Sequence, residues 1–320
     1  MMWAFLIHLS EHMWDDETSP LRGLYLPKGY DENNKPDMQT WDEVIASLPK
    51  YGINTLLIDL GDAVKYETHP EISAPDAWSK DFMKKKLDEI RALGIQPIPK
   101  LNFSAAHDTW LKQYNRMIAT PTYYAVCADL IGEVCELFDY PPLFHLGMDE
   151  ETEGFQHRFA VTTIRNEQVW WHDLNFFFKE CEKHGSRPWI WATFSLTKYP
   201  NTFAQNMPKS VVMTLGYYGQ FHNDSTTTPE ARAKSDQAIA RYEFINSLGY
   251  DQIPMSSTWN YYRNTLQTLG LAKDRLDPKL VKGFIMATWL HTKKWECHGL
   301  IHGAEQLYYA RKKHYPETFE

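Results

Sequence analysis

The stretch LFHLGMDEETEG, residues 143–154, runs from apolar residues into a cluster of negative charge. Its first part, residues 143–149, is nearly continuously apolar, which predicts a strand buried on both faces of a parallel sheet. Three consecutive carboxylates, beginning at Asp149, end this run. The dipeptide Asp-Glu occurs at four other places in the chain, so only its position in the fold can give this pair a meaning.

Apolar runs of the same length recur along the whole chain. The predicted strands cover residues 3–9, 54–60, 96–102, 143–149, 188–194, 211–218, 252–258 and 283–289. Amphipathic patterns of helical period lie between many of them, at residues 41–52, 79–94, 122–138, 166–185, 228–249 and 304–315. Strands that alternate with helices predict an α/β fold, a (β/α)8 TIM barrel, and no linker divides residues 1–320 into separate domains.

Composition narrows the classes of function. Of the 320 residues, 43% are hydrophobic and 23% are charged, which is typical of a soluble globular protein. The net charge of −8 gives no reason to expect nucleic acid or an anionic membrane as a partner. No apolar run approaches the length needed to span a membrane.

The cysteines and the first residues give an expectation for the cellular location of the protein. The four cysteines form no C-x-x-C pair and predict no disulfide framework: Cys127, Cys135, Cys181 and Cys297. The start, MMWAFLIHLS, has no basic region, and His8 interrupts its apolar run, so no signal peptide is predicted. A reduced, cytoplasmic location is expected, although an export signal trimmed from the sequence would leave the same start.

The barrel fold predicts where the carboxylates lie. Active sites in this architecture lie at the C-terminal ends of the strands, and Asp149 and Glu150 stand at the end of the fourth predicted strand. The period of two predicts that His145, Gly147 and Asp149 face the barrel interior. Glu150 follows where the strand gives way to a loop.

Other strand ends supply carboxylates, a histidine and aromatic side chains. With His145, the predicted substrate-binding residues are Glu11, Asp62, His107, Trp191, Tyr217, Tyr218, Trp259 and Trp289. Glycoside cleavage needs such a set, because a carboxylic acid protonates the leaving oxygen and a second group stabilises an oxocarbenium-like centre. Aromatic walls hold the sugar ring.

Structural roles compete with these assignments. A carboxylate at a strand end can cap the following helix or pair with a lysine, and His8 and His145 fit satisfied interior histidines. No H-E-x-x-H occurs, so no metal site and no cofactor are predicted. The absence of G-x-S-x-G, G-x-G-x-x-G and Walker motifs weakens the esterase, dinucleotide and phosphoryl-transfer classes.

The segment HLGMDE, residues 145–150, resembles the H-x-G-x-D-E motif of family 20 glycoside hydrolases, the β-N-acetylhexosaminidases. Residues 92–107, ALGIQPIPKLNFSAAH, resemble the family segment in which V-I-P-E-I-D leads to P-G-H. Residues 52–72 resemble its second strand and following loop. Residues 283–289, GFIMATW, resemble its eighth strand, which ends in a tryptophan of the sugar pocket.

This resemblance implies an exo-acting enzyme that removes a terminal β-linked N-acetylhexosamine with retention of configuration. By the resemblance to this motif, Glu150 is the general acid/base. Asp149 orients the 2-acetamido group of the substrate. The carbonyl oxygen of that group attacks the anomeric carbon, so the substrate assists its own cleavage. The resemblance also implies an acetamido pocket completed by a late-strand tyrosine and several tryptophans: Tyr217 or Tyr218, with Trp191, Trp259 and Trp289.

The sequence departs from the family at the positions that grip the sugar hydroxyls. The family's first strand usually carries an arginine, where this chain has Ser10, Glu11 and His12. In the third strand, Lys100 and Asn102 replace a glutamate and an aspartate, which suggests a rebuilt sugar subsite. The identity of the sugar is therefore left open.

Three alternatives stay open at this point. The first is a retaining glycosidase on a 2-hydroxyl sugar, with Asp59, Asp62 or Glu11 as a protein nucleophile opposite Glu150. The second is a carbohydrate-binding protein on a catalytically silent barrel. A metal-dependent hydrolase comes last.

Overall fold

The strands close into a parallel barrel. The computed structural model describes residues 1–10, 37–157, 159, 161–221 and 228–319. The strands in these ranges are β1 (Met2–His8), β2 (Thr55–Asp59), β3 (Gln96–Lys100), β4 (Leu143–His145), β5 (Arg187–Trp191), β6 (Val212–Thr214), β7 (Met255–Ser256) and β8 (Gly283–Met286). They follow the order β6-β5-β4-β3-β2-β1-β8-β7. Single parallel bridges from Met213 to Gln252 and from Gly216 to Met255 join β6 to β7. The predicted (β/α)8 barrel is confirmed.

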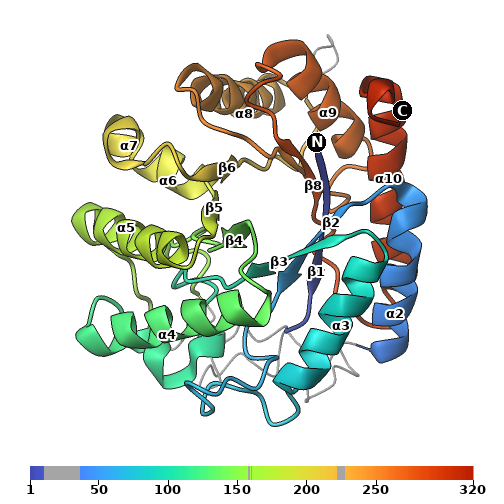
Figure 1. Cartoon of the computed structure of the whole chain (residues 1–320). Coiled ribbons are helices and arrows are strands. Elements are labelled where there is room, and N and C mark those ends of the chain that lie inside the picture. The colour runs from blue at the N-terminus through green and yellow to red at the C-terminus, as the bar shows by residue number, and fades with distance from the viewer. Residues whose placement is uncertain (11–36, 158, 160, 222–227, 320) are drawn as a thin grey trace.

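Helices form a ring outside the strands (Figure 1). The α-helices are α2 (Met38–Ser47), α3 (Lys80–Ala92), α4 (Pro121–Leu137), α5 (Glu167–Lys183), α6 (Thr193–Lys198), α7 (Pro200–Asn206), α8 (Pro229–Ser247), α9 (Asn264–Arg275) and α10 (Cys297–His314). Short 3-10 helices are η1 (Leu48–Tyr51), η2 (Thr109–Arg116) and η3 (Pro316–Phe319). No helix in the described ranges is long and apolar enough to cross a membrane.

Local sequence explains where several helices begin. A polar side chain accepts a hydrogen bond from the first turn of α2, α3, α4, α5 and α8, through Asp37, Ser79, Thr120, Asn166 and Thr228. Helices α6, α7 and α9 lack such a cap and were not predicted. α6 and α7 are also short, and Gly270 weakens the helical signal within α9.

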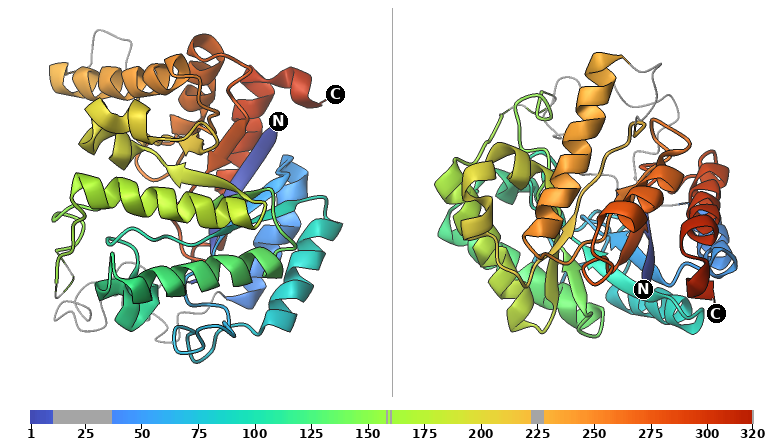
Figure 2. Two further views of the ribbon diagram at one scale, coloured as in Figure 1. Left: turned by 60° about the vertical axis from the view of Figure 1, so that its left-hand side comes forward. Right: turned by 90° about the horizontal axis from the view of Figure 1, so that it is seen from above.

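Two apolar layers stabilise the barrel. Alternate strand residues, such as Leu6, Leu57 and Ile98, fill the interior, while the opposite faces of the strands pack against the helices. The first strand and the last helix lie side by side (Figure 2). There the Arg311 guanidinium lies 4.7 Å from the centre of the Trp3 ring. All four cysteines are free.

Strand β4 is shorter than predicted. It ends at His145 instead of residue 149, because Gly147 (φ 68°) and Met148 (φ 64°) adopt left-handed backbone conformations that no strand continues through. The prediction that the fourth strand extends to residue 149 was therefore wrong. Asp149 and Glu150 lie in the β4–α5 loop, beyond the end of the strand.

Candidate active site

Asn102, just beyond β3, orients Asp149. The Asn102 amide nitrogen donates to Asp149 Oδ1 at 2.9 Å, while Asn102 Oδ1 accepts from the backbone nitrogens of Met148 and Ser104, each at 3.1 Å. The Ser104 hydroxyl donates to the backbone carbonyl of Asp149. One amide side chain thus uses both ends to fix the carboxylate and the loop that carries it, a role that sequence reasoning missed.

Gly147 leaves the space that Asn102 occupies. A Cβ on Gly147 would lie 2.0 Å from Asn102 Oδ1, and the φ of 68° is itself unfavourable for other residues. We expect Gly147→Ala to lower the free energy of unfolding by about 1–3 kcal/mol, measured by urea denaturation. Gly154→Ala is the control, because its new Cβ would meet nothing nearer than Thr152 Oγ1 at 3.8 Å. Equal stability of the two variants would contradict the strain.

Glu150 faces His107 from the neighbouring loop. His107 Nε2 lies 3.1 Å from Glu150 Oε2 and 3.7 Å from Asp149 Oδ2. The Glu150 side chain is 42% exposed, whereas those of Asp149 and His107 are 18% and 8% exposed. Glu150 is therefore the carboxylate that a substrate can reach, and His107 supports it from the protein side.

The charge of His107 depends on these carboxylates. Burial by itself would lower the pKa of His107, but the negative charges of Asp149 and Glu150 outweigh it, and the pKa lies above the ordinary 6.5. A raised folded-state pKa means that protonation stabilises the fold. That contribution is complete below the ordinary pKa and is lost as pH rises through the folded-state pKa.

We therefore expect the stability gap between the wild type and His107→Gln to shrink as pH rises. The measurement is urea denaturation of both proteins at steps from about pH 5 to about pH 9. The wild type should have its largest advantage at the acidic end. A gap that stays constant, or that grows with pH, would show that His107 is not held protonated by the two carboxylates.

Three aromatic side chains gather beside the carboxylates. Ring centroids of Trp191 and Trp289 are 6.0 Å apart, and those of Tyr218 and Trp289 are 6.2 Å apart, both pairs meeting edge to face. Burial, together with the charges of Glu150 and Asp149, raises the pKa of Tyr218 well above its usual value. The Tyr218 hydroxyl therefore stays neutral and lies within the field of the carboxylate pair.

His145 packs against Trp191 of this aromatic group. Its ring centroid is 4.0 Å from that of Trp191, and its Nδ1 accepts a hydrogen bond from the backbone nitrogen of Gly147 at 3.0 Å. Burial, and then the charge of Lys100, lower its pKa well below 6.5. The ring is therefore neutral, and the accepting Nδ1 assigns its proton to Nε2.

Below the site, strand residues form a buried ion pair. Lys100 Nζ donates to Asp59 Oδ2, and His8 Nδ1 lies 3.3 Å from the same oxygen. Burial alone would raise the pKa of Asp59, but Lys100 and His8 bring it below its usual value. Lys100 was expected in a rebuilt sugar subsite. It is instead 1% exposed, and its ammonium group forms an ion pair with Asp59.

The other candidate nucleophile, Asp62, is also engaged. Its Oδ1 accepts a hydrogen bond from the Ser10 hydroxyl at 2.6 Å, and the residue is 3% exposed. Asp59 and Asp62 therefore both serve contacts within the protein. Glu11, the third candidate, lies outside the described residues.

Two predicted aromatic residues lie away from the cluster. Tyr217 packs on Phe221, with ring centroids 5.0 Å apart, and its hydroxyl donates to the backbone carbonyl of Gln220. Trp259 is 60% exposed in the β7–α9 loop. Of the two tyrosines left open by the sequence, the structure places Tyr218 beside Trp289.

A divalent ion could be held by the same group of side chains. One ligand atom each from His107, Asp149 and Glu150 lies within 4.8 Å of the others, the one such cluster in the described part of the chain. One imidazole and two carboxylates suit several divalent metals. The sequence predicted no metal, and an ion here would bind Glu150, the expected proton donor.

The similarities of this chain to known proteins are structural. No family model matches the sequence, and no curated protein matches it. A family 20 exo-β-N-acetylglucosaminidase from Vibrio harveyi matches with a TM-score of 0.59 at 12% identity, over 99% of this chain and 57% of that chain. The chain has the fold of a family 20 glycoside hydrolase barrel.

Two further solved structures share this barrel fold. The β-N-acetylhexosaminidase from Bacteroides fragilis matches with a TM-score of 0.59 at 12% identity, over 95% of this chain and 65% of that one. Dispersin B matches with a TM-score of 0.56 at 13% identity, over 98% and 99% of the two chains. This chain thus spans about three fifths of the first two proteins and nearly all of the third.

Proposed function

We propose that this protein is an exo-acting, retaining β-N-acetylhexosaminidase-like glycosidase that uses substrate assistance. Glu150 is the general acid/base, and Asp149 orients the 2-acetamido group. The observation that carries the proposal is that side chains from separate strands and loops meet around Asp149 and Glu150. Asn102 and His107 hold the two carboxylates, and the aromatic group of Trp191, Tyr218 and Trp289 stands beside them.

The geometry suits a division of labour between the carboxylates. Glu150, the more exposed one, gives its proton to the glycosidic oxygen as the bond to the anomeric carbon breaks. Asn102 occupies Asp149 Oδ1, which leaves Oδ2 to accept the substrate's acetamido N–H. The acetamido oxygen then bonds to the anomeric carbon. In the second step Glu150 removes a proton from the water that opens this oxazolinium intermediate.

The spacing of the pair argues against inversion. An oxygen of Asp149 lies within 4.8 Å of an oxygen of Glu150. Inverting pairs are separated by roughly 6.5–9.5 Å, so that a water fits between the sugar and the base. Adjacent carboxylates on one loop act from the same side of the substrate, which suits the acid and acetamido-orienting roles.

A buried donor supports binding of a polar ligand. Trp191 is 3% exposed, yet its Nε1 has no hydrogen-bond partner among the described residues. Buried polar groups in proteins are nearly always hydrogen-bonded. An oxygen of a bound sugar would satisfy this donor, and the neighbouring indole and phenol rings would cover the apolar part of the ligand.

The test is hydrolysis of four matched aryl glycosides, the β-N-acetylglucosaminide, β-N-acetylgalactosaminide, β-glucoside and β-galactoside. Substrate assistance predicts turnover of the acetamido sugars and inhibition by a thiazoline that mimics the oxazolinium intermediate. Preference for a 2-hydroxyl sugar would refute assistance and favour a protein nucleophile. Tight sugar binding without turnover of any glycoside would indicate a silent binding barrel. Loss of activity on chelation, restored by a divalent metal, would indicate metal-dependent hydrolysis.

A further inference from the structure

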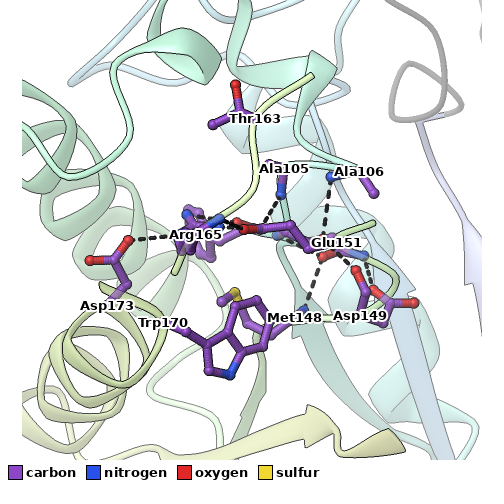
Figure 3. Close-up of polar contacts among 12 residues, drawn as sticks. Ala105, Ala106, Met148, Asp149, Glu151, Thr163, Arg165, Trp170 and Asp173 are labelled. Atoms are coloured by element: carbon purple, nitrogen blue, oxygen red, sulfur yellow. Dashed lines mark hydrogen bonds and ion pairs between the residues drawn. The ribbon is translucent and has the colours of Figure 1, made fainter. Parts of the chain in front are cut away.

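A buried cluster of charges lies directly behind the carboxylate pair. Its members are Glu151, Arg165 and Asp173 (Figure 3). Their side chains are 0% exposed. Arg165 Nη1 donates to Glu151 Oε2, and Arg165 Nε donates to Asp173 Oδ2 at 2.6 Å. Glu151 is the third carboxylate of the acidic run, and it points away from the exposed side, into the protein.

This cluster joins the two loops that carry the candidate acid and its histidine. Glu151 Oε2 accepts from the backbone nitrogen of Ala105 at 3.0 Å, two residues before His107. Arg165 Nη2 donates to the backbone carbonyl of Phe103 at 3.3 Å, in the same β3–η2 loop. Glu151 itself directly follows Glu150, so the cluster connects the loop of Glu150 with the loop of His107.

The helices anchor the cluster from behind. Arg165 Nη2 also donates to the Tyr123 hydroxyl of α4 at 3.0 Å, and the Tyr124 hydroxyl donates to Asp173 of α5. Burial would lower the pKa of Arg165, but the charge of Glu151 outweighs it and raises the pKa, so the guanidinium keeps its charge. Every strong contact of this cation is within the protein.

Stability alone does not explain such a cluster. Burying charges costs desolvation free energy that the ion pair only offsets, and apolar residues of similar volume often stabilise a fold equally well. What an apolar group cannot supply is directional hydrogen bonding to two loops at once. A forked guanidinium does this with fixed geometry.

We propose that Arg165 and Glu151 are positioning residues that fix Glu150 against His107, an inference that rests on the proposed function of Glu150. They touch no substrate and act only through the two loops. Misplacement of a catalytic group by about 1 Å can slow a reaction by about 10²-fold. Loosening the cluster should therefore lower kcat and leave KM nearly unchanged, because the acid acts in the transition state.

Arg165→Lys is the decisive variant. It preserves the charge, so it does not change the direct electrostatic effect on His107. The single ammonium nitrogen of lysine, however, lacks the planar fork whose three nitrogens bond Glu151, Asp173 and Phe103. The expected result is a His107 pKa that falls toward 6.5, since the carboxylates that raise it move away. NMR titration of the histidine rings measures this pKa. The resonance that is missing from the His107→Gln spectrum identifies His107. kcat should fall by about 10²-fold.

Glu133→Gln is the matched control. Glu133 is another buried glutamate, 6% exposed, whose carboxylate accepts from the backbone nitrogens of Glu67 and Thr68 in the β2–α3 loop. It should lose stability but keep the wild-type His107 pKa and kcat. Glu151→Gln, nearly identical in shape to the wild type, provides a second variant if Arg165→Lys does not fold.

A folded Arg165→Lys or Glu151→Gln protein with the wild-type His107 pKa would overturn the proposal, as would failure of both variants to fold. Glu133→Gln shifting the pKa equally would also overturn it, because the effect would then belong to stability in general. The titration needs no turnover. Wild-type protein without glycosidase activity would refute the proposed function, while the His107 shift would still report whether the cluster positions the loops.

Discussion

Glu150→Gln is expected to slow hydrolysis of substrates with poor leaving groups by about 10²–10⁴-fold. The amide preserves the shape of the side chain and its place beside His107 but has no proton to give to the glycosidic oxygen. Because Glu150 is 42% exposed at the site, the change should affect chemistry far more than folding. Steady-state kinetics on an unactivated disaccharide and on an activated aryl glycoside measure the loss.

The two substrates separate the role of the acid from other roles. Activated aryl glycosides need little protonation, so their glycosylation step should lose much less than that of the disaccharide. Glu153→Gln, an exposed carboxylate three residues further along, should leave both rates nearly unchanged. Equal losses with both substrates in Glu150→Gln would contradict the assignment of Glu150 as the acid.

Asp149→Asn is expected to raise the activation barrier by about 2–4 kcal/mol, a loss of about 30-fold to 10³-fold in kcat/KM. The charged acceptor for the acetamido N–H becomes a neutral one, and charge-assisted hydrogen bonds are roughly twice as strong as neutral ones. Kinetics with aryl β-N-acetylglucosaminide in both proteins measure this directly.

The loss should be specific to 2-acetamido sugars. A 2-hydroxyl sugar offers no amide for Asp149 to orient, so any slow turnover of aryl β-glucoside should change little. Asn102→Ala, which releases Asp149 Oδ1, should reproduce part of the effect with the acetamido substrate. The same loss with both classes of sugar would remove Asp149 from the acetamido role.

Local patterns in the sequence were sufficient for the architecture. Apolar runs predicted the strands, and polar caps such as Ser79 and Asn166 begin helices where the amphipathic patterns start. Because parallel strands bring their C-terminal ends to one side, the order of the elements also predicted that His107 and Glu150 would lie at the same end of the barrel. The structure places them 3.1 Å apart.

Periodicity could not predict where the fourth strand ends. Alternation assumes an extended backbone, and it fails at Gly147 and Met148, whose conformations are left-handed. The Met148 backbone nitrogen donates a hydrogen bond to Asn102 Oδ1, from a residue 46 positions away, just beyond the end of another strand. The same limit applies to Tyr217 and Tyr218, because a sequence places two neighbours on opposite faces without saying which face meets Trp289.

The sequence by itself determined the barrel and the end of the barrel at which Asp149 and Glu150 lie, because both depend on short-range period and chain order. Only the tertiary structure decided the pairing of the charges. Lys100 meets Asp59, and Arg165 meets Glu151, through contacts between separate elements. A buried charge requires a partner, but any of several oppositely charged residues satisfies that requirement until folding sets the distances.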